Sequence, residues 1–225
     1  MLQCSQFDLI KISSRKLSLI WIGFAFFFFG LFIKLSWELH EDSMLDLLDV
    51  KILTLISHLR LTSLNGPAVD ISALGSPTLI TIFSVLIVAI LFYFKDFYGS
   101  SYIAIGTMGA GIGTYLLKHF FIRDRPSVVT HLVEVSGFSY PSGHSLSATS
   151  FYLLIMIVTW RHFYSKTSKT ILFLVTNLLI MTICVSRLYL GVHYPTDVFS
   201  GILFGIAWTC FLTAYFSTTI LIQNP

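Results

Sequence analysis

The chain has 225 residues, of which 55% are hydrophobic and only 11% charged, and its mean hydropathy is +0.82. Because soluble domains carry about 25% charged residues, this composition excludes an ordinary soluble domain and indicates a protein built for lipid. The formal net charge of +3 is small and no block of Lys and Arg exists, so nucleic-acid binding is not expected.

The first apolar run, Leu17–Trp37, follows a basic stretch formed by Lys11, Arg15 and Lys16. A membrane-spanning helix needs about 20 mostly apolar residues, and this run is long enough. It exceeds the apolar region of a secretory signal and lacks a convincing A-x-A-like cleavage site. We therefore predict a retained anchor span.

A segment with helical periodicity follows the first run. Its apolar positions are Leu45, Leu48, Ile52, Leu55, Ile56 and Leu59, and its polar face comprises Asp42, Asp46 and Asp49. This pattern predicts an amphipathic helix lying at the membrane interface. Two roles are open for residues 42–60: simple interfacial packing, which we favour, and a lid over a functional site.

Five further apolar runs predict membrane spans: Pro77–Phe94, Ser101–Leu117, Ser145–Trp160, Ile171–Ser186 and Val198–Ile222. The expected fold is an all-α integral membrane protein, a bundle of six transmembrane helices with an extra interfacial helix between the first two. Residues 1–225 would form a single membrane-embedded domain with its core at about 77–222. Gly109-x3-Gly113 and Gly201-x3-Gly205 predict close helix contacts.

Basic residues in the short loops predict the orientation. They precede the first span, follow the second, and lie between the fourth and fifth: Lys11, Arg15, Lys16, Lys95, Arg161, Lys166 and Lys169. The segment after the first span is acidic instead. By the positive-inside rule, both termini are cytoplasmic, and the loops at the other ends of the spans lie on the outer face.

Three short segments at the span ends on that outer face contain side chains that can take part in catalysis. They are Lys118-x6-Arg125-Pro126, Pro141-Ser142-Gly143-His144 and Ser186-Arg187-x5-His193-x3-Asp197. Taken singly, each has an ordinary explanation: a cation that reaches the headgroups, a turn that begins a helix, or a structural His–Asp pair. Taken together, they gather three cations, two imidazoles and a carboxylate on one face.

In order, spacing and shared face, the three segments resemble the motifs of the type 2 phosphatidic acid phosphatase family, the membrane lipid phosphate phosphatases. No signature position is substituted, and the resemblance covers roughly residues 50–220. It implies a phosphatase acting on a lipid phosphate. It also implies, for the matching positions, the roles derived next from the residues themselves.

Phosphoryl transfer depends on positioning and on stabilising charge at the equatorial oxygens. Lys118, Arg125 and Arg187 are the predicted cationic clamp, since guanidinium groups bind phosphate in a bidentate manner. Ser142 offers a hydroxyl. Gly143 permits close approach of backbone N–H groups where the fourth span begins.

His193 is the predicted nucleophile, forming a phosphohistidine, with Asp197 fixing its tautomer from the first turn of the sixth span. His144 is the predicted general acid, which afterwards activates water, so the pH–rate profile should be bell-shaped. Arg123 is a further candidate for phosphate binding. Asp124 is expected to pair with a neighbouring cation.

No cofactor and no metal is expected. The cysteines Cys4, Cys184 and Cys210 show no metal-ligand spacing, and no disulfide framework is inferred. The remaining histidines near the motifs, His119 and His131, are expected to be structural.

The leading hypothesis is a phosphatase in a bacterial inner membrane, acting at its outer face on a lipid from the bilayer, with no obligate protein partner. Undecaprenyl diphosphate is slightly favoured; phosphatidylglycerophosphate, phosphatidic acid and lipid A phosphates remain open. A lipid-to-lipid phosphotransferase of the same family is the alternative. A soluble vanadium-dependent haloperoxidase conflicts with six spans. A transporter is disfavoured because the charges gather on one face instead of crossing the bilayer.

Overall fold

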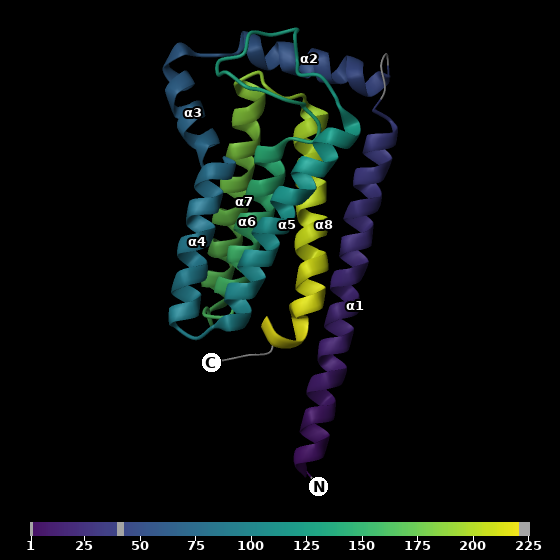
Figure 1. Ribbon diagram of the computed structural model, residues 1–225, viewed down its shortest axis with the longest axis vertical. Coiled ribbons are helices and arrows are strands. Elements are labelled where there is room, and N and C mark those ends of the chain that lie inside the picture. The colour runs from purple at the N-terminus through teal and green to yellow at the C-terminus, as the bar shows by residue number, and fades with distance from the viewer. Residues whose placement is uncertain (1, 40–42, 221–225) are drawn as a thin grey trace.

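The computed structural model describes residues 2–39 and 43–220, and within them every regular element is a helix (Figure 1). The helices are α1 (Leu2–Trp37), α2 (Met44–His58), the short 3₁₀ helix η1 (Thr62–Leu64), α3 (Asn65–Ala73), α4 (Pro77–Tyr93), α5 (Phe97–Phe121), α6 (Gly143–Trp160), α7 (Lys166–Tyr189) and α8 (Pro195–Ile220). The prediction of an all-α fold is confirmed for these residues.

Helices α4 to α8 form a bundle along the long axis of the molecule, with α1 packed beside α8 and α2 lying across one end (Figure 1). Helix α6 is central, because it contacts α4, α5, α7 and α8. Since successive helices reverse direction, α5 and α7 end where α6 and α8 begin. The three sequence motifs therefore share one end of the bundle.

Within residues 2–39 and 43–220, three helical segments are long and apolar enough to cross a membrane: residues 15–37, 166–189 and 195–217. A fourth is added if α3 and α4, which meet at 45°, count as one bent span. Helices α5 and α6 of the predicted six spans do not meet this criterion. In α6, six of the eleven buried residues are Ser, Thr, Ala or Gly, which lower the hydropathy of the helix and let it pack closely against its neighbours.

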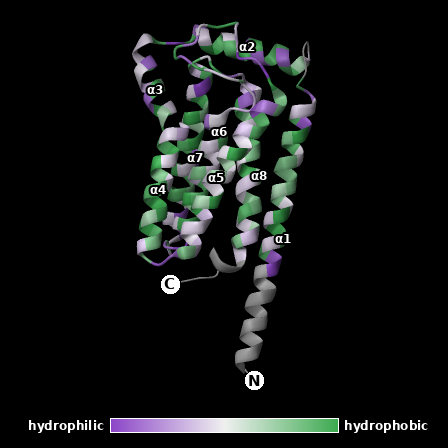
Figure 2. Cartoon of the chain, viewed as in Figure 1, coloured by the Kyte–Doolittle hydropathy of each residue, from purple (hydrophilic) through white to green (hydrophobic). Residues whose placement is uncertain are grey.

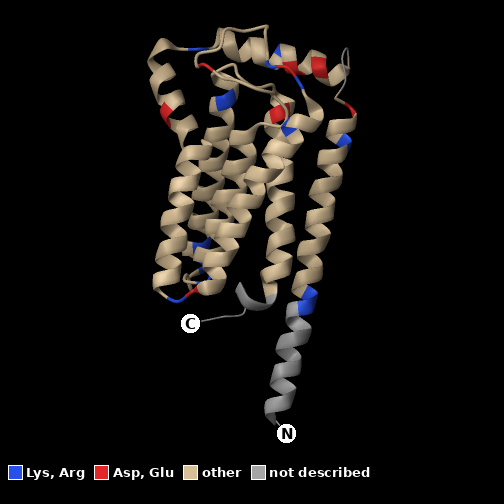
Figure 3. Ribbon diagram, viewed as in Figure 1, with Lys and Arg blue, Asp and Glu red and all other residues tan. Residues whose placement is uncertain are grey.

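Hydropathy along the bundle agrees with a membrane protein. Hydrophobic residues cover the helix shafts (Figure 2), while charged residues gather at the two ends (Figure 3). On α1, Phe26 is 71% exposed and Phe24 and Phe27 are also exposed. An apolar surface of this size is typical of a helix that faces lipid or another protein, and not water.

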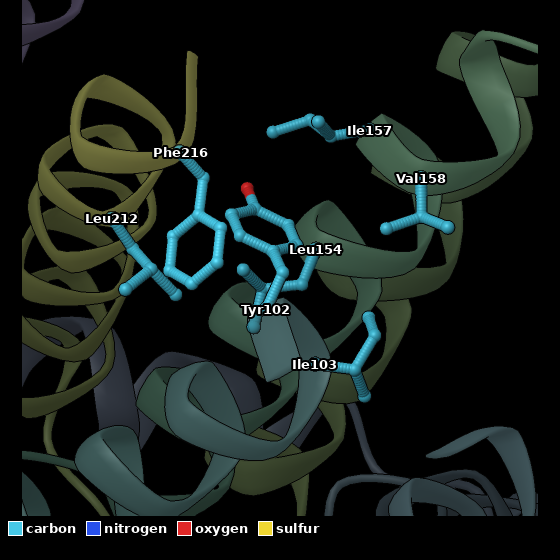
Figure 4. Packing of buried hydrophobic residues seen from close by; sticks show 7 residues of the cluster. All are labelled: Tyr102, Ile103, Leu154, Ile157, Val158, Leu212 and Phe216. Carbon is cyan, nitrogen blue, oxygen red and sulfur yellow. The ribbon is translucent and has the colours of Figure 1, made fainter. Parts of the chain in front are cut away.

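A buried cluster joins α5, α6 and α8 (Figure 4). Tyr102 lies at its centre, fully buried, and its ring packs against Phe216 at 5.5 Å between centroids. The Tyr102 hydroxyl is hydrogen-bonded to Thr213 at 2.7 Å, so the one polar group of this cluster has a partner.

Helix α8 approaches α6 through its glycine pair. A Cβ atom at Gly201 would lie 2.7 Å from the carbonyl oxygen of Ser142, and one at Gly205 would lie 2.9 Å from Cβ of Thr149. No other residue fits at this separation, so the predicted role of these glycines in close packing is confirmed. The α5 pair packs on α8 side chains: Gly109 on Trp208 and Gly113 on Phe204.

Helix α2 corresponds to the segment with amphipathic periodicity; Asp42 lies outside the described residues. Ser43 begins the helix, its hydroxyl accepting a hydrogen bond from the Asp46 N–H at 3.1 Å. Asp49 and Leu53 are buried toward the bundle, whereas Leu48 and Leu55 are exposed. One carboxylate of the predicted polar face therefore points into the protein.

Candidate active site

The turn between α7 and α8 places His193 directly before α8. Gly191 has φ +78°, and a Cβ there would lie 3.0 Å from the carbonyl oxygen of Thr130, so the chain needs glycine at this bend. Pro195 occupies the first helical position and Asp197 the first turn. The carboxylate of Asp197 accepts a hydrogen bond from the Tyr194 N–H at 2.8 Å, which fixes its orientation.

His193 is buried, with only 2% of its surface exposed. Its Nδ1 lies 3.4 Å from Oδ2 of Asp197 and 3.4 Å from the hydroxyl of Ser139, which donates to the same carboxylate. With Nδ1 facing Asp197, Nε2 is the nitrogen left for a substrate. Burial lowers the pKa of His193 to about 4; the charges of Arg187 and Arg125 add to this effect, and Asp197 opposes it. The imidazole is therefore neutral at pH 7.

The second motif begins α6 and touches the third. The Ser142 N–H donates to the carbonyl oxygen of Asp197 at 2.9 Å. The Ser142 hydroxyl is the N-cap, accepting from the Ser145 N–H at 3.4 Å and from the Ser145 hydroxyl at 3.0 Å. Gly143 follows: a Cβ there would lie 3.7 Å from Cε of Lys118.

His144 lies in the first turn of α6 and is partly exposed. It is within electrostatic range of Arg187, His193, Arg125 and Lys118. Members of the first and third motifs therefore act on this imidazole of the second.

The cations of the first motif hold the loop that joins α5 to α6. Lys118 donates to the carbonyl oxygens of Phe138 and, at 3.3 Å, of Ser139. Arg125 donates at 2.9 Å to three carbonyl oxygens, those of Ser136, Gly137 and Val192. Both cations thus shape the site as well as supplying charge.

Arg187 differs from these two cations because one of its N–H groups is buried without a hydrogen-bond partner among the described residues. It lies in the last turn of α7, is only 4% exposed, and donates from Nη1 to the hydroxyl of Ser72 at 2.5 Å. Its buried Nε has no hydrogen-bond partner in the described part of the chain. A buried guanidinium group with an unsatisfied N–H next to His193 is suited to hold an anion.

Arg123, the further candidate for phosphate binding, is paired with carboxylates. Its guanidinium donates to Asp197 at 2.7 Å and to Asp49 at 2.9 Å, and it stacks 4.3 Å from the ring centre of Tyr194. Asp124 is exposed and forms no ion pair with any residue that the structure describes, so its predicted pairing is wrong.

The two other histidines near the motifs, His119 and His131, are hydrogen-bonded to backbone carbonyl groups. The ring of His119 bonds to the carbonyl oxygen of Tyr115 at 2.8 Å, and that of His131 to the carbonyl oxygen of Pro126 at 2.6 Å. Both contacts are local, which agrees with the structural roles expected for these residues.

Sequence reasoning missed the residues that surround Asp197. Ser139, Thr196 and Asp49 belong to no predicted motif, although Ser139 and Thr196 lie close to motif residues in the chain. Asp49 is 147 residues away from its partner Thr196, and only its place on a helix face gave any signal. Among the described side chains, no group of three or more His, Cys, Asp or Glu residues is arranged to hold a metal ion.

The fold and the site together define an integral membrane protein, a helical bundle with two histidines, a carboxylate and several cations gathered at one end. The chain belongs to the PAP2 superfamily, whose family model matches residues 73–220. The resemblance read from the three motifs is thereby confirmed.

Two relatives and one solved structure show the range of similarity. Phosphatidylglycerophosphatase B of Bacillus subtilis is 30% identical over 145 residues, 64% of this chain and 70% of that protein. Undecaprenyl-diphosphatase of Sulfolobus acidocaldarius is 30% identical over 92 residues, 40% of each chain. The crystal structure of a transmembrane PAP2-type phosphatidylglycerolphosphate phosphatase from Bacillus subtilis has a TM-score of 0.82 at 24% identity, covering 88% of this chain and 98% of that one. Because the sequence identity is only 24%, this structural similarity shows a shared fold and nothing about the activity of this chain.

Proposed function

We propose that this protein is a membrane phosphatase that hydrolyses a lipid phosphate or diphosphate through a phosphohistidine intermediate. The observation that carries the proposal is the buried His193–Asp197 pair beside Arg187, a guanidinium with an unsatisfied N–H. A neutral imidazole next to spare cationic donors is what nucleophilic attack on a phosphate group requires.

The proposed reaction has two steps. Nε2 of His193 attacks phosphorus, the bond from phosphorus to the lipid oxygen breaks, and His144 donates a proton to that leaving oxygen. His144 then takes a proton from water, which attacks the phosphohistidine and releases phosphate. Arg187, Lys118 and Arg125 hold the phosphate oxygens, and N–H groups at the start of α6, next to Ser142, add further donors. No metal enters either step.

We further propose that six helices cross the membrane: α1, α4, α5, α6, α7 and α8. Helices α5 and α6 each run from one end of the bundle to the other, so the loops before and after each helix lie at opposite ends. Each of these helices must therefore cross the membrane if the bundle does. The positive-inside rule places α2 and the site on the outer face, with both termini in the cytoplasm. In a bacterial cell, the membrane would be the inner membrane and the site would face the periplasm or exterior.

The substrate is proposed as a class. Relatives carry the names phosphatidylglycerophosphatase B and undecaprenyl-diphosphatase, so both lipids have support from similarity. A site at the membrane surface suits any amphiphile whose headgroup ends in phosphate. Undecaprenyl diphosphate and phosphatidylglycerophosphate are therefore the first two lipids to test, followed by phosphatidic acid and lipid A phosphates.

The test is release of inorganic phosphate by the purified protein in lipid nanodiscs, across that panel of lipids. His193→Ala should reduce turnover to background, whereas His119→Ala, on the same face but bonded to Tyr115, should leave it unchanged. Phosphate release without an added lipid acceptor identifies a phosphatase. If phosphate appears only on a second lipid, the protein is a phosphotransferase, and if His193→Ala stays active, the nucleophile is another group.

A further inference from the structure

Helix α2, which lies across the end of the bundle, sends one carboxylate into the site. Asp49 is 1% exposed, although it sits on a helix with several exposed apolar residues. Its Oδ1 accepts a hydrogen bond from the Thr196 N–H at 2.9 Å, and its Oδ2 accepts from the Thr196 hydroxyl. Burying a carboxylate is costly unless it is paired, so this position requires specific partners.

The contact with Thr196 caps helix α8 from a distant part of the chain. Thr196 is the second residue of α8, so its N–H is one of those left without a partner inside the helix. A carboxylate at a helix N-terminus satisfies such a donor and is favoured by the helix dipole. Asp49 thereby fixes the first turn of α8, which also carries Asp197.

Arg123 connects Asp49 to Asp197. Its Nη1 donates to Oδ1 of Asp197 at 2.7 Å and to the Thr196 hydroxyl at 2.8 Å, and its Nη2 donates to Oδ2 of Asp49 at 2.9 Å. The face of the guanidinium lies over the ring of Tyr194. One planar cation is thus shared between two buried carboxylates, a geometry that lysine cannot reproduce.

The two carboxylates and the guanidinium of this network shift one another's pKa values. Burial raises the pKa of Asp49, and the hydrogen bonds from Thr196 and Arg123 act against this. Burial would lower the pKa of Arg123, but the two carboxylates raise it overall. If Asp49 lost its charge, Arg123 would be attracted mainly to Asp197, because Asp46 is farther away at 3.4 Å and is exposed, and would draw the Asp197 carboxylate away from His193.

We propose that Asp49 of α2, acting through Arg123, is a positioning residue that holds Asp197 against the nucleophile His193. This inference rests on the proposed function, because it assumes that His193 attacks the phosphate. It also assigns a role to α2: through Asp49, this helix is attached to the first turn of α8, which carries Asp197.

Helix α2 supplies its own control residue. Asp46 lies one turn before Asp49 and also faces Arg123, but at 3.4 Å and with 39% of its side chain exposed. The variants Asp49→Asn and Asp46→Asn remove the same charge from the same helix. Asparagine at 49 still offers an oxygen to the Thr196 N–H, so the cap is preserved while the ion pair is lost.

The experiment measures kcat and KM for phosphate release from the best lipid of the panel, per folded protein, with thermal unfolding as the control for structure. Asp49→Asn should lower kcat about tenfold or more with KM within about twofold, because misalignment affects the reacting groups and not lipid binding. Asp46→Asn should stay within about twofold of the wild type. In an Asp197→Asn background, Asp49→Asn should cause no further loss, since its effect passes through Asp197.

The outcomes separate this inference from the proposed function. If the wild type is active and His193→Ala is not, but Asp49→Asn keeps wild-type kcat, or lowers kcat by its full factor again in the Asp197→Asn background, the positioning role is refuted and the phosphatase stands. If Asp49→Asn does not fold, the variant Arg123→Lys tests the proposal instead. Lysine keeps the positive charge but cannot donate to both carboxylates as the planar guanidinium group does. A wild-type kcat in Arg123→Lys overturns the proposal, and a loss of kcat at unchanged KM supports it.

Discussion

Substitution of Gly201 by alanine tests whether the site depends on the close contact between α6 and α8. A Cβ at this position would lie 2.7 Å from the carbonyl oxygen of Ser142, 3.0 Å from Cβ of Ser145 and 3.1 Å from the backbone nitrogen of Leu146. Two of these atoms belong to backbone, so no side-chain rotation relieves the clash. The N-terminal turn of α6 and the first turns of α8 must separate.

The size of the effect follows from the geometry. Ordinary contact begins at 3.4 Å, so the two helices must move apart by about 0.7 Å at this point. Overpacking of this kind costs about 1–3 kcal/mol of stability. The same shift separates His144 on α6 from His193, and a misplacement of about 1 Å lowers turnover by about a hundredfold. We expect kcat to fall between tenfold and about a hundredfold.

Gly111→Ala is the matched control, because a Cβ at Gly111 on α5 meets nothing within 4 Å. Both variants should be purified in nanodiscs and compared by thermal unfolding and by phosphate release. Gly201→Ala should unfold at a lower temperature and turn over more slowly, while Gly111→Ala should match the wild type. Equal kcat and unfolding midpoints for the two variants would refute the view that the α6–α8 contact sets the site geometry.

Three further predictions concern pH, metal and the opposite end of the bundle. The acid limb of kcat/KM should have an apparent pKa near 4, because the His193 imidazole becomes protonated only as the pH falls through that value. Arg187→Gln should move this limb to higher pH, since its charge lowers the pKa of His193; an unmoved limb would assign it to another group. Turnover should persist in excess EDTA, and loss that magnesium restores would overturn the metal-free mechanism. Asp96→Ala should lower the unfolding midpoint with kcat unchanged, because Asp96 caps α5 at Gly99 and pairs with Arg161, far from the site; a lower kcat per folded protein would contradict this.

The helices and the location of the site were predictable from the sequence for a physical reason. In lipid every backbone N–H and C=O needs a hydrogen-bond partner within the protein. A long apolar run meets this requirement by forming an α-helix. Helices joined by short loops alternate in direction, which places Lys118, Gly143, Arg187 and His193 at one end. The side chains at those ends were chemically distinctive enough to indicate a phosphate site.

The surroundings of these residues were decided only by the tertiary structure. Which face of α2 turns inward, why Asp49 is buried, and why Arg123 serves Asp197 all depend on contacts between distant parts of the chain. Asp49 and Thr196 are 147 residues apart, and helical periodicity can mark a polar face but not its partner. The sequence by itself determined the apolar helices and the reactive groups at their ends. The packing of α2 and α6 on α8 decided how those groups are held, because only packing brings their charges and backbone donors within hydrogen-bonding distance.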